Sequence, residues 1–550
     1  MAVLSRTLLG VVVAGLAGVV RADTTTTAPP VLSQTDFKSA CLAFNAQQHV
    51  SNSTLWIREF IPGNTTIANS DNVASCGRPT QLVSVDLCRI VLSIPTSKQS
   101  SFNFELWMPR EWSNKGQRIV ATGNGGIDGC VRYEDLGYLT QYGFAAVGTN
   151  NGHNGTTAVT MLNNSDVIKD FADRALGQSI IQGKKLIQFF YGAAHKKAYY
   201  YGCSLGGRQG ITMADKYPGE FDGIYAGSPA VDFNNMNSWR ATFATITGEP
   251  GDDTFISANL WTGLIHNEVL NQCDGLDGVK DGVIEDPDIC HFDPTTIQCG
   301  SPAVQPCLTA AQVSTVNKIF SPFTDEDGNV IFPAMQPGSE IGAVTTLYGG
   351  TIFSYSSDWF KYVVYNDPSW VGIPFTAADA ALADALNPAD IRTYPKSLRN
   401  QYNSGGKVIV THGMQDEKIT SFNSERFYNN LLAGMHRTPA ELEEFYRFFR
   451  ITGMGHCANG PGAWVVGTQG GPLATAIGGL DPEKSVLGAL VNWVENGVAP
   501  DTLEGTKFVN DDPAQGIAFT RKHCRYPLRN TYIGGDSSNP DSWVCKAVSS

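Results

Sequence analysis

The sequence predicts an α/β fold in which a mostly parallel sheet carries helices on both faces, with one large segment inserted into it. From about residue 100, short β-rich runs alternate with helical runs, which is the order that builds a parallel sheet. Between about residues 229 and 400 this alternation stops, and cysteines, aromatic residues and an Asp/Gly-rich loop replace it. The 550 residues, 42% of them hydrophobic, can bury a large core as several domains or as one domain with an insertion.

The N-terminal end has the pattern of a secretory signal peptide. Arg6 provides a short positive region, residues 8–20 form an apolar run, and Val20-Arg21-Ala22 fits a small-residue cleavage site. The apolar run is too short to span a bilayer. We therefore expect residues 1–22 to be removed and the protein to be secreted.

Two further features agree with secretion. The twelve cysteines are an even number, which in an oxidising compartment predicts six disulfides whose pairing the sequence alone leaves open. Four Asn-x-Ser/Thr triplets predict glycosylation, at Asn52, Asn64, Asn154 and Asn163.

The formal net charge of −13 disfavours nucleic acid and anionic membrane surfaces as partners, because like charges repel. The mild acidity identifies no substrate, and a homodimer stays open.

The regular elements flank the inserted segment. The predicted strands are Arg118–Thr122, Phe144–Thr149, Ala198–Tyr201, Phe221–Gly227, Lys407–His412 and Phe445–Thr452, and the predicted helices are Asp166–Tyr191 and one that ends near Pro218. We assign residues 23–228 and 400–550 to one catalytic domain and residues 229–399 to an inserted domain.

The chain contains a single Gly-x-Ser-x-Gly pattern, Gly202 to Gly206, centred on Ser204. It follows an apolar strand and opens a helix, as the nucleophile turn of an α/β-hydrolase requires. Small neighbours avoid clashes in that strained turn, and the helix N-terminus stabilises developing negative charge. We therefore predict an α/β-hydrolase fold with a large inserted lid domain and Ser204 as nucleophile, with an ordinary glycine-rich turn as the alternative.

A serine hydroxyl needs a base, and in this fold the chain order is Ser, acid, His. His456 follows the last predicted strand, and Asp416 follows the strand before it. His412 and His523 compete with His456, and Glu417 competes with Asp416. Cys203 precedes the nucleophile and Cys457 follows the base, so a disulfide between them would hold the pair together.

Backbone N–H groups must stabilise the oxyanion. Leu205, directly after the nucleophile, is one expected donor. Gly126, in the run Gly123-Asn124-Gly125-Gly126, is the other, with a plain turn as the alternative.

The inserted segment holds an acidic loop, residues 273–283, with Asp274, Asp277 and Asp281 separated by glycines. Alternating carboxylates and carbonyls suit Ca²⁺, although the spacing is not that of an EF-hand. We expect a structural Ca²⁺ site in the lid, with an acidic turn as the alternative. No Cys/His cluster has the spacing of a zinc site.

From about Cys41 to Cys545 the chain resembles the tannase and feruloyl esterase family, and within it the type B feruloyl esterases. The resemblance is carried by Gly-Cys-Ser-Leu-Gly-Gly-Arg-Gln-Gly (202–210), Thr-His-Gly-Met-Gln-Asp (411–416), Gly-Met-Gly-His-Cys (453–457) and Arg-Lys-His-Cys-Arg-Tyr-Pro (521–527).

This resemblance implies a triad of Ser204, Asp416 and His456, and Ca²⁺ ligands at Asp274, Asp277, Asp281 and the carbonyls of Val279 and Val283. It also implies the bridges Cys203–Cys457, Cys41–Cys88, Cys76–Cys130, Cys273–Cys290, Cys299–Cys307 and Cys524–Cys545. The implied activity is release of ferulic and related acids from cell-wall polysaccharide esters without an organic cofactor. A tannase acting on galloyl esters, an inactive aromatic- or carbohydrate-binding protein and a serine peptidase are the alternatives.

Overall fold

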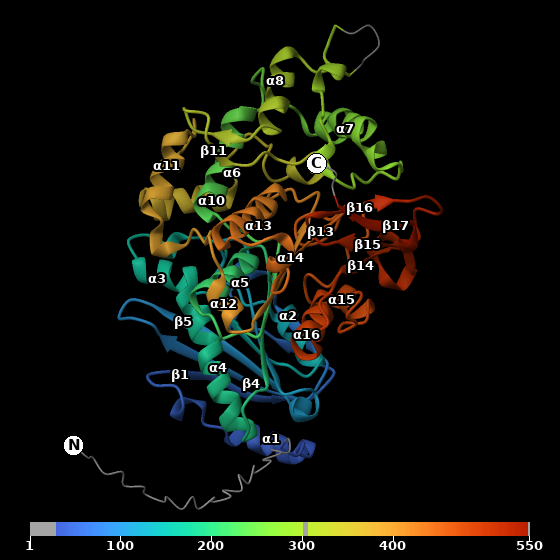
Figure 1. Ribbon diagram of the computed structural model, residues 1–550. Helices are drawn as coiled ribbons and strands as arrows, with labels where there is room; N and C mark the ends of the chain where they lie inside the picture. Colours follow the sequence, from blue (N-terminus) through green and yellow to red (C-terminus); the bar gives the residue numbers. More distant parts are fainter. Residues whose placement is uncertain (1–28, 301–305, 548–550) are drawn as a thin grey trace, which may run out of the picture.

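In the computed structural model, which describes residues 29–300 and 306–547, nine strands form one mixed sheet (Figure 1). The predicted signal peptide lies outside these residues. In spatial order the strands are β1 (Thr54–Ile61), β4 (Leu87–Pro95), β5 (Ser101–Pro109), β7 (Ala145–Thr149), β6 (Arg118–Thr122), β8 (Lys197–Cys203), β9 (Gly223–Gly227), β12 (Lys407–Gly413) and β13 (Tyr446–Ile451).

Six of these strands, β7 to β13 in the spatial order, are parallel, and each corresponds to a predicted strand. The three at the other end, β1, β4 and β5, pair antiparallel and were not predicted as strands. The α/β prediction is confirmed, and the antiparallel edge extends it.

Helices cover both faces of the sheet. They are α1 (Gln34–Ala43), α2 (Tyr133–Gln141), α3 (Ser165–Lys169), α4 (Ala175–Tyr191), α5 (Leu205–Lys216), α12 (Arg399–Asn403), α13 (Phe422–Met435), α14 (Pro439–Leu442), α15 (Pro472–Ala476) and α16 (Val486–Asn496). Successive strand residues point to opposite faces. Tyr200 therefore packs in the core that includes residues of α4, α5 and α13, whereas Tyr199 and Tyr201 pack in the core that includes residues of α2 and α16.

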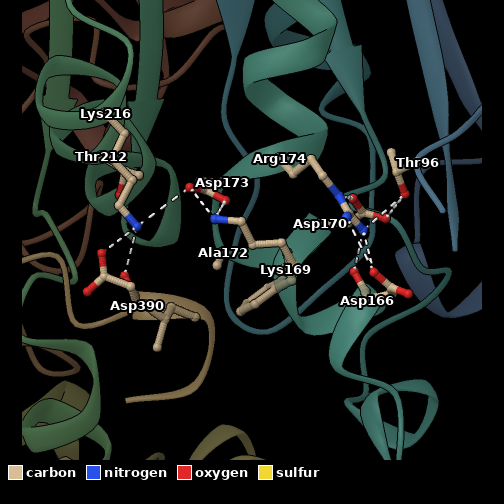
Figure 2. A network of polar contacts seen from close by, with 12 residues as sticks. Thr96, Asp166, Lys169, Asp170, Ala172, Asp173, Arg174, Thr212, Lys216 and Asp390 are labelled. Carbon is tan, nitrogen blue, oxygen red and sulfur yellow. Dashed lines mark hydrogen bonds and ion pairs between the residues drawn. The ribbon is translucent and has the colours of Figure 1, made fainter.

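The predicted helix over 166–191 is two helices joined by a π-helical turn, Asp170–Arg174. A π turn inserts a residue into the helical ladder. Here it carries a polar network in which the Asp170 carboxylate accepts hydrogen bonds from Thr96 and Arg174 (Figure 2).

Between β9 and β12 the chain forms a largely helical segment, visible in green and yellow at the top of Figure 1. Its helices are α6 (Phe233–Thr247), α7 (His266–Cys273), α8 (Ala310–Ile319), α9 (Glu340–Ala343), α10 (Ser354–Trp359) and α11 (Ala377–Leu386), with a hairpin of β10 (Phe323–Thr324) and β11 (Val330–Phe332). A third core, which includes Leu205 from the start of α5, joins this segment to the sheet's loops. Lys216 of α5 also reaches Asp390 at 2.8 Å (Figure 2).

The remaining strands form three hairpins outside the sheet: β2 (Thr65–Ala68) with β3 (Thr80–Val83), β14 (Thr502–Phe508) with β15 (Ile517–Cys524), and β16 (Leu528–Tyr532) with β17 (Trp543–Ala547). Six disulfides join the pairs that the family resemblance implied. Within the described ranges, no helix is long and apolar enough to cross a bilayer.

Candidate active site

Ser204 lies in the sharp turn between β8 and α5. Its φ of +66° is a left-handed conformation that non-glycine residues rarely adopt. The turn is fixed on both sides, because Ser204 N–H donates to the Gly227 carbonyl at 2.9 Å and Gly206 N–H donates to the Asn124 carbonyl at 2.9 Å. A Cβ at residue 206 would meet that Asn124 oxygen at 3.1 Å, so the close approach favours glycine there.

The serine, a histidine and an acid form one hydrogen-bonded line. Ser204 Oγ lies 2.8 Å from His456 Nε2, and His456 Nδ1 lies 2.8 Å from Asp416 Oδ2. Asp416 comes from the loop after β12 and His456 from the loop after β13. These loops leave the carboxyl ends of neighbouring parallel strands, so they meet above the nucleophile. The arrangement can deprotonate the hydroxyl and stabilise the imidazolium that results.

Asp416 is buried and receives several donors. Its Oδ1 accepts the backbone N–H groups of Lys418 and Ile419, at 2.9 and 2.8 Å. Its Oδ2, which also contacts His456, accepts from the His412 ring at 3.1 Å. Burial by itself would raise the pKa of the Asp416 carboxyl, but the two histidines outweigh it and hold that pKa well below its ordinary value. Asp416 therefore remains an anion wherever His456 has to accept a proton.

The competing residues have other positions. His412 is fully buried behind the acid, where its Nε2–H also lies 3.0 Å from the Ile419 carbonyl and its Nδ1 lies 2.7 Å from Ser424 Oγ. His523 is buried against the Ala463 carbonyl, at 2.8 Å. Glu417 accepts the backbone N–H of His456 at 2.9 Å and so contacts the base loop rather than the ring.

Residues of the inserted segment support the acid loop. The Gln336 side-chain amide donates to the Asp416 carbonyl, at 2.5 Å, and its oxygen accepts from Ser421 N–H. Arg240 donates to the Lys418 carbonyl at 2.8 Å. Neither residue can be predicted from the sequence, because isolated glutamine and arginine residues in a helical insertion form no motif.

The disulfide Cys203–Cys457 links the nucleophile turn to the base loop, with a Cα–Cα distance of 6.1 Å. The two cysteines are 254 positions apart in the chain. This covalent link constrains the separation of Ser204 and His456.

Both expected oxyanion donors lie beside Ser204. Leu205 begins α5, so its N–H is one of the groups that lack an intrahelical acceptor. Gly126 has φ +55° and lines the same small cavity as Ser204 and Leu205. A Cβ at Gly126 would lie 2.5 Å from the Tyr355 ring, so the inserted segment packs directly on this loop.

A pocket of about 300 Å³ opens at Ser204 and His456. Phe353 and Tyr355, whose rings pack edge to face, line it from the inserted segment. The pocket can therefore hold an aromatic group next to the nucleophile.

The lining of this pocket also includes the polar residues Arg132, Glu134 and Asp135. Burial, together with the neighbouring Glu134 charge, raises the pKa of Asp135 to about 7. Its carboxylate accepts the Gly470 N–H at 2.7 Å. The pocket therefore presents polar groups as well as aromatic rings to a ligand.

The acidic loop of the inserted segment is ordered by its own carboxylates. Asp274 accepts from Gly282 N–H at 3.1 Å, and Asp277 Oδ1 accepts from Val279 N–H at 2.9 Å. Asp277 Oδ2 is buried without a hydrogen-bond partner, and burial raises the pKa of this carboxyl to about 7. Asp281 instead pairs with Arg521 at 2.8 Å. Across the described ranges, no three His, Cys, Asp or Glu side chains are gathered so that they alone could hold a metal ion.

Comparison with known proteins gives a consistent result. The family model "Tannase and feruloyl esterase" matches residues 88–365 and 392–546. A probable feruloyl esterase B-2 of Aspergillus flavus is 53% identical over 90% of this chain and 94% of its own length. The crystal structure of feruloyl esterase B from Aspergillus oryzae, 42% identical, superposes with a TM-score of 0.88 over 93% of this chain and all of that one. A tannin acyl hydrolase from Aspergillus niger, 22% identical over 95% of this chain and 97% of its own, shares the fold with a TM-score of 0.74.

Proposed function

The chain belongs to the tannase and feruloyl esterase family, and from this premise we propose that it releases ferulic and related hydroxycinnamic acids from plant cell-wall polysaccharides. As a homologue of feruloyl esterase B it is a serine carboxylesterase. The observation that carries the proposal is the line of hydrogen bonds from Ser204 through His456 to Asp416, beside a pocket with an aromatic wall.

In the proposed reaction, Ser204 Oγ attacks the ester carbonyl carbon while His456 Nε2 takes its proton. Asp416 stabilises the imidazolium, and the N–H groups of Leu205 and Gly126 stabilise the oxyanion. His456 then returns the proton to the leaving alcohol, which leaves an acyl-enzyme. Water, deprotonated by the same histidine, attacks that acyl group, and the histidine returns the proton to Ser204 Oγ as the hydroxycinnamic acid leaves.

The test compares kcat/KM on methyl ferulate and methyl gallate. We expect a preference for ferulate, and a fall in kcat of about 10⁴- to 10⁶-fold in Ser204→Ala. Ser179→Ala, at a buried serine on α4 that bonds its own helix, is the matched control and should keep activity. A preference for gallate would make the protein a tannase. Wild-type protein that binds these esters without hydrolysing either would be an inactive binding protein.

We propose that residues 229–399 act as a lid that selects the ester. Phe353 and Tyr355 support this role, because they line the pocket and Tyr355 packs on Gly126. Replacing Phe353 with Ala should raise KM for methyl ferulate more than it lowers kcat, because the ring contacts the acyl group in both ground and transition states. A selective loss of kcat would instead place Phe353 in the chemistry.

We propose secretion after cleavage behind Ala22. Six disulfides and four exposed sequons support this, since both belong to proteins that pass through an oxidising secretory route. Mass spectrometry of protein from culture medium should show residue 23 first and glycans on Asn52, Asn64, Asn154 and Asn163. Intact residues 1–22 on the external protein would contradict the proposal.

We also propose a structural Ca²⁺ in the acidic loop. Asp277 supports it, because a buried carboxylate oxygen without a donor matches a cation ligand. The side chains of Asp274, Asp277 and Asp281 and the carbonyls of Val279 and Val283 would hold the ion, which would neutralise the loop's charge.

Calcium should raise the Tm of chelator-treated protein by several degrees, and Asp277→Asn should abolish that rise. Asp325→Asn, in an exposed acidic turn, is the matched control and should preserve it. An unchanged Tm together with no calorimetric binding of Ca²⁺ would contradict the proposal.

A further inference from the structure

A second cleft, of about 730 Å³, lies at the antiparallel end of the sheet. It is separate from the pocket at Ser204, with which it shares no lining residue. Most of its lining is uncharged and polar, with serine hydroxyls from the turn between β4 and β5 and asparagine amides from the chain after β7. Lys98 is the one charged side chain of this lining.

One large aromatic residue completes the cleft. Trp56 on edge strand β1 is 49% exposed. The register between β1 and β4 shifts between Leu55 and Ile57, so Trp56 occupies a β-bulge. Bulges at sheet edges re-aim a side chain. An exposed indole in a cleft rich in hydroxyls and amides, with a single charged side chain, suits a ligand with an apolar C–H face and many hydroxyl groups.

The walls of the cleft are fixed in place. The turn from Thr96 to Ser100 is attached to the π-helical turn, because Asp170 Oδ2 accepts from Thr96 Oγ1 at 2.6 Å and from Ser100 Oγ at 2.5 Å. Arg174 pairs with Asp170 from the other side (Figure 2). The amide oxygen of Asn150 accepts the backbone N–H of Asn103 at 2.8 Å, which joins the β7 loop to β5. Preorganised walls reduce the entropy that a ligand must overcome on binding.

The cleft lies along the same edge of the sheet as the nucleophile. The pairs Thr54–Ser93, Pro95–Ser101 and Phe104–Thr149 place the start of β1, the β4–β5 turn and the end of β7 together. The end of β7 is the carboxyl edge of the parallel strands, from which Ser204 also projects. From β8, strands β5 and β1 are three and five steps away in the sheet. At about 4.8 Å a step, the cleft begins roughly 14 to 24 Å from Ser204 along this edge.

The two regions are also joined through His153. This buried histidine lines the cleft, and its Nε2–H donates to the Ile127 carbonyl at 3.0 Å, directly after Gly126 of the oxyanion loop. One continuous edge of the molecule therefore carries the ester pocket and the polar cleft.

We propose that this cleft is a carbohydrate-binding subsite, in which Trp56 stacks on a sugar ring of the neutral polysaccharide whose ester side group enters the pocket at Ser204. The proposal rests on the proposed ester hydrolase function. It adds a binding site remote from the bond that is cleaved, so the polymer rather than the small ester is the ligand that this site recognises.

The first measurement is binding of the complete protein to ester-free arabinoxylan, with polygalacturonate as a polyanionic probe. Wild type should bind arabinoxylan and not the polyanion, and Trp56→Ala should weaken arabinoxylan binding at least ten-fold. Trp56→Phe, which keeps an aromatic ring, should retain part of the affinity. Phe189→Ala removes an aromatic side chain of similar exposure, 53%, outside the cleft lining and is the matched control. Equal binding by wild type and Trp56→Ala would overturn the proposal.

Measurements of kcat/KM distinguish a failure of the carbohydrate subsite from a failure of the proposed ester hydrolase function. Trp56→Ala should leave kcat/KM on methyl ferulate unchanged, which also shows that the variant folds, and should lower kcat/KM on feruloylated arabinoxylan several-fold. Because the binding assay uses an ester-free polymer, it can succeed or fail whatever the protein hydrolyses.

A glycan on Asn154, at the cleft, has the same chemistry as the proposed ligand. If only Asn154→Gln bound arabinoxylan, the protein's own glycan would occupy the cleft, and the proposal would be wrong.

Discussion

Single residues that contact Asp416 determine the pKa and the orientation of its carboxylate. Asp416 has two histidine partners, of which only His456 reaches Ser204. His412 is a positioning residue, because it contacts the acid and no group that would touch the ester. Its Nε2–H, shared between Asp416 and the Ile419 carbonyl, holds the carboxylate in the orientation that His456 needs.

We therefore expect His412→Asn to lower kcat about ten-fold with little change in KM. The loss of one donor should let the pKa of Asp416 rise toward its ordinary value, so kcat should fall more steeply at acid pH, where the Asp416 carboxyl begins to be protonated. A kcat–pH series on methyl ferulate measures both effects. His523→Asn, at a buried histidine outside the site, controls for general damage. A fall in kcat with an unchanged slope at acid pH would assign His412 a purely structural role.

Motifs predicted some of these residues and could not predict others. Ser204, Asp416 and His456 stand at turns that follow apolar strands, so strand order alone indicates that they meet. From the sequence His412 is a rival base, because sequence shows which residue types are present but not which side of a carboxylate each one faces. Gln336, Phe353 and Tyr355 reach the site only through the packing of the inserted segment, which has no periodic signal.

Among the strands, too, some can be predicted from the sequence and others cannot. The six parallel strands are buried on both faces, and their continuous apolar runs predict them well. Strands β1, β4 and β5 are not predicted from the sequence, although β4 and β5 are mostly buried. Arg89 and Glu105 interrupt their apolar pattern, and the structure explains this, since the two pair at 2.6 Å inside the sheet. A buried ion pair across neighbouring strands cannot be recognised before the pairing of the strands is known.

The link between the nucleophile turn and the base loop can be tested at the scale of the element. Replacing Cys203 and Cys457 with serine removes a constraint on a closed loop of 254 residues. The chain-entropy relation gives about 5.5 kcal/mol of lost stability for a loop of this length. We expect urea unfolding to show a loss of that order, with a large fall in kcat because the separation of Ser204 and His456 is no longer fixed.

Replacing Cys299 and Cys307 is the matched control. Their separation is 8 residues, for which the same relation gives about 2.5 kcal/mol, and the bridge is not among the residues that line the active-site pocket. This variant should lose some stability and keep kcat. Equal losses of kcat in both variants would show that the Cys203–Cys457 bridge has no special role in the site.

Buried acids couple the stability of the whole molecule to pH. Glu425 lies beside Asp286, Asp288 and Arg450, where α13, β13 and the inserted segment meet. Burial, with repulsion from the two aspartates, raises the pKa of Glu425 to about 8. A raised pKa stabilises the folded state fully below the unfolded pKa of about 4.5, and this contribution is lost as pH rises toward 8. Asp416, with its lowered pKa, contributes in the opposite sense and loses its contribution in strong acid.

The protein should therefore be less stable at pH 8 than at pH 5. Glu425→Gln should remove a part of this difference on the order of 4 kcal/mol, because glutamine does not titrate. Urea unfolding at the two pH values measures it, with the exposed Glu326→Gln as control. Identical pH dependence in Glu425→Gln and wild type would rule out Glu425 as the source.

The Cys203–Cys457 bridge has one more consequence, for the state of the protein after a protease has cut its chain. The two cysteines close a covalent ring that contains the whole inserted segment and the Asp416 loop. A single cut in an exposed turn of that segment would yield two polypeptides that still share one molecule, with Ser204 and His456 held next to each other. Such a nicked enzyme would run as one band on a gel until it is reduced. It would keep its hydrolytic activity after its chain has been cut.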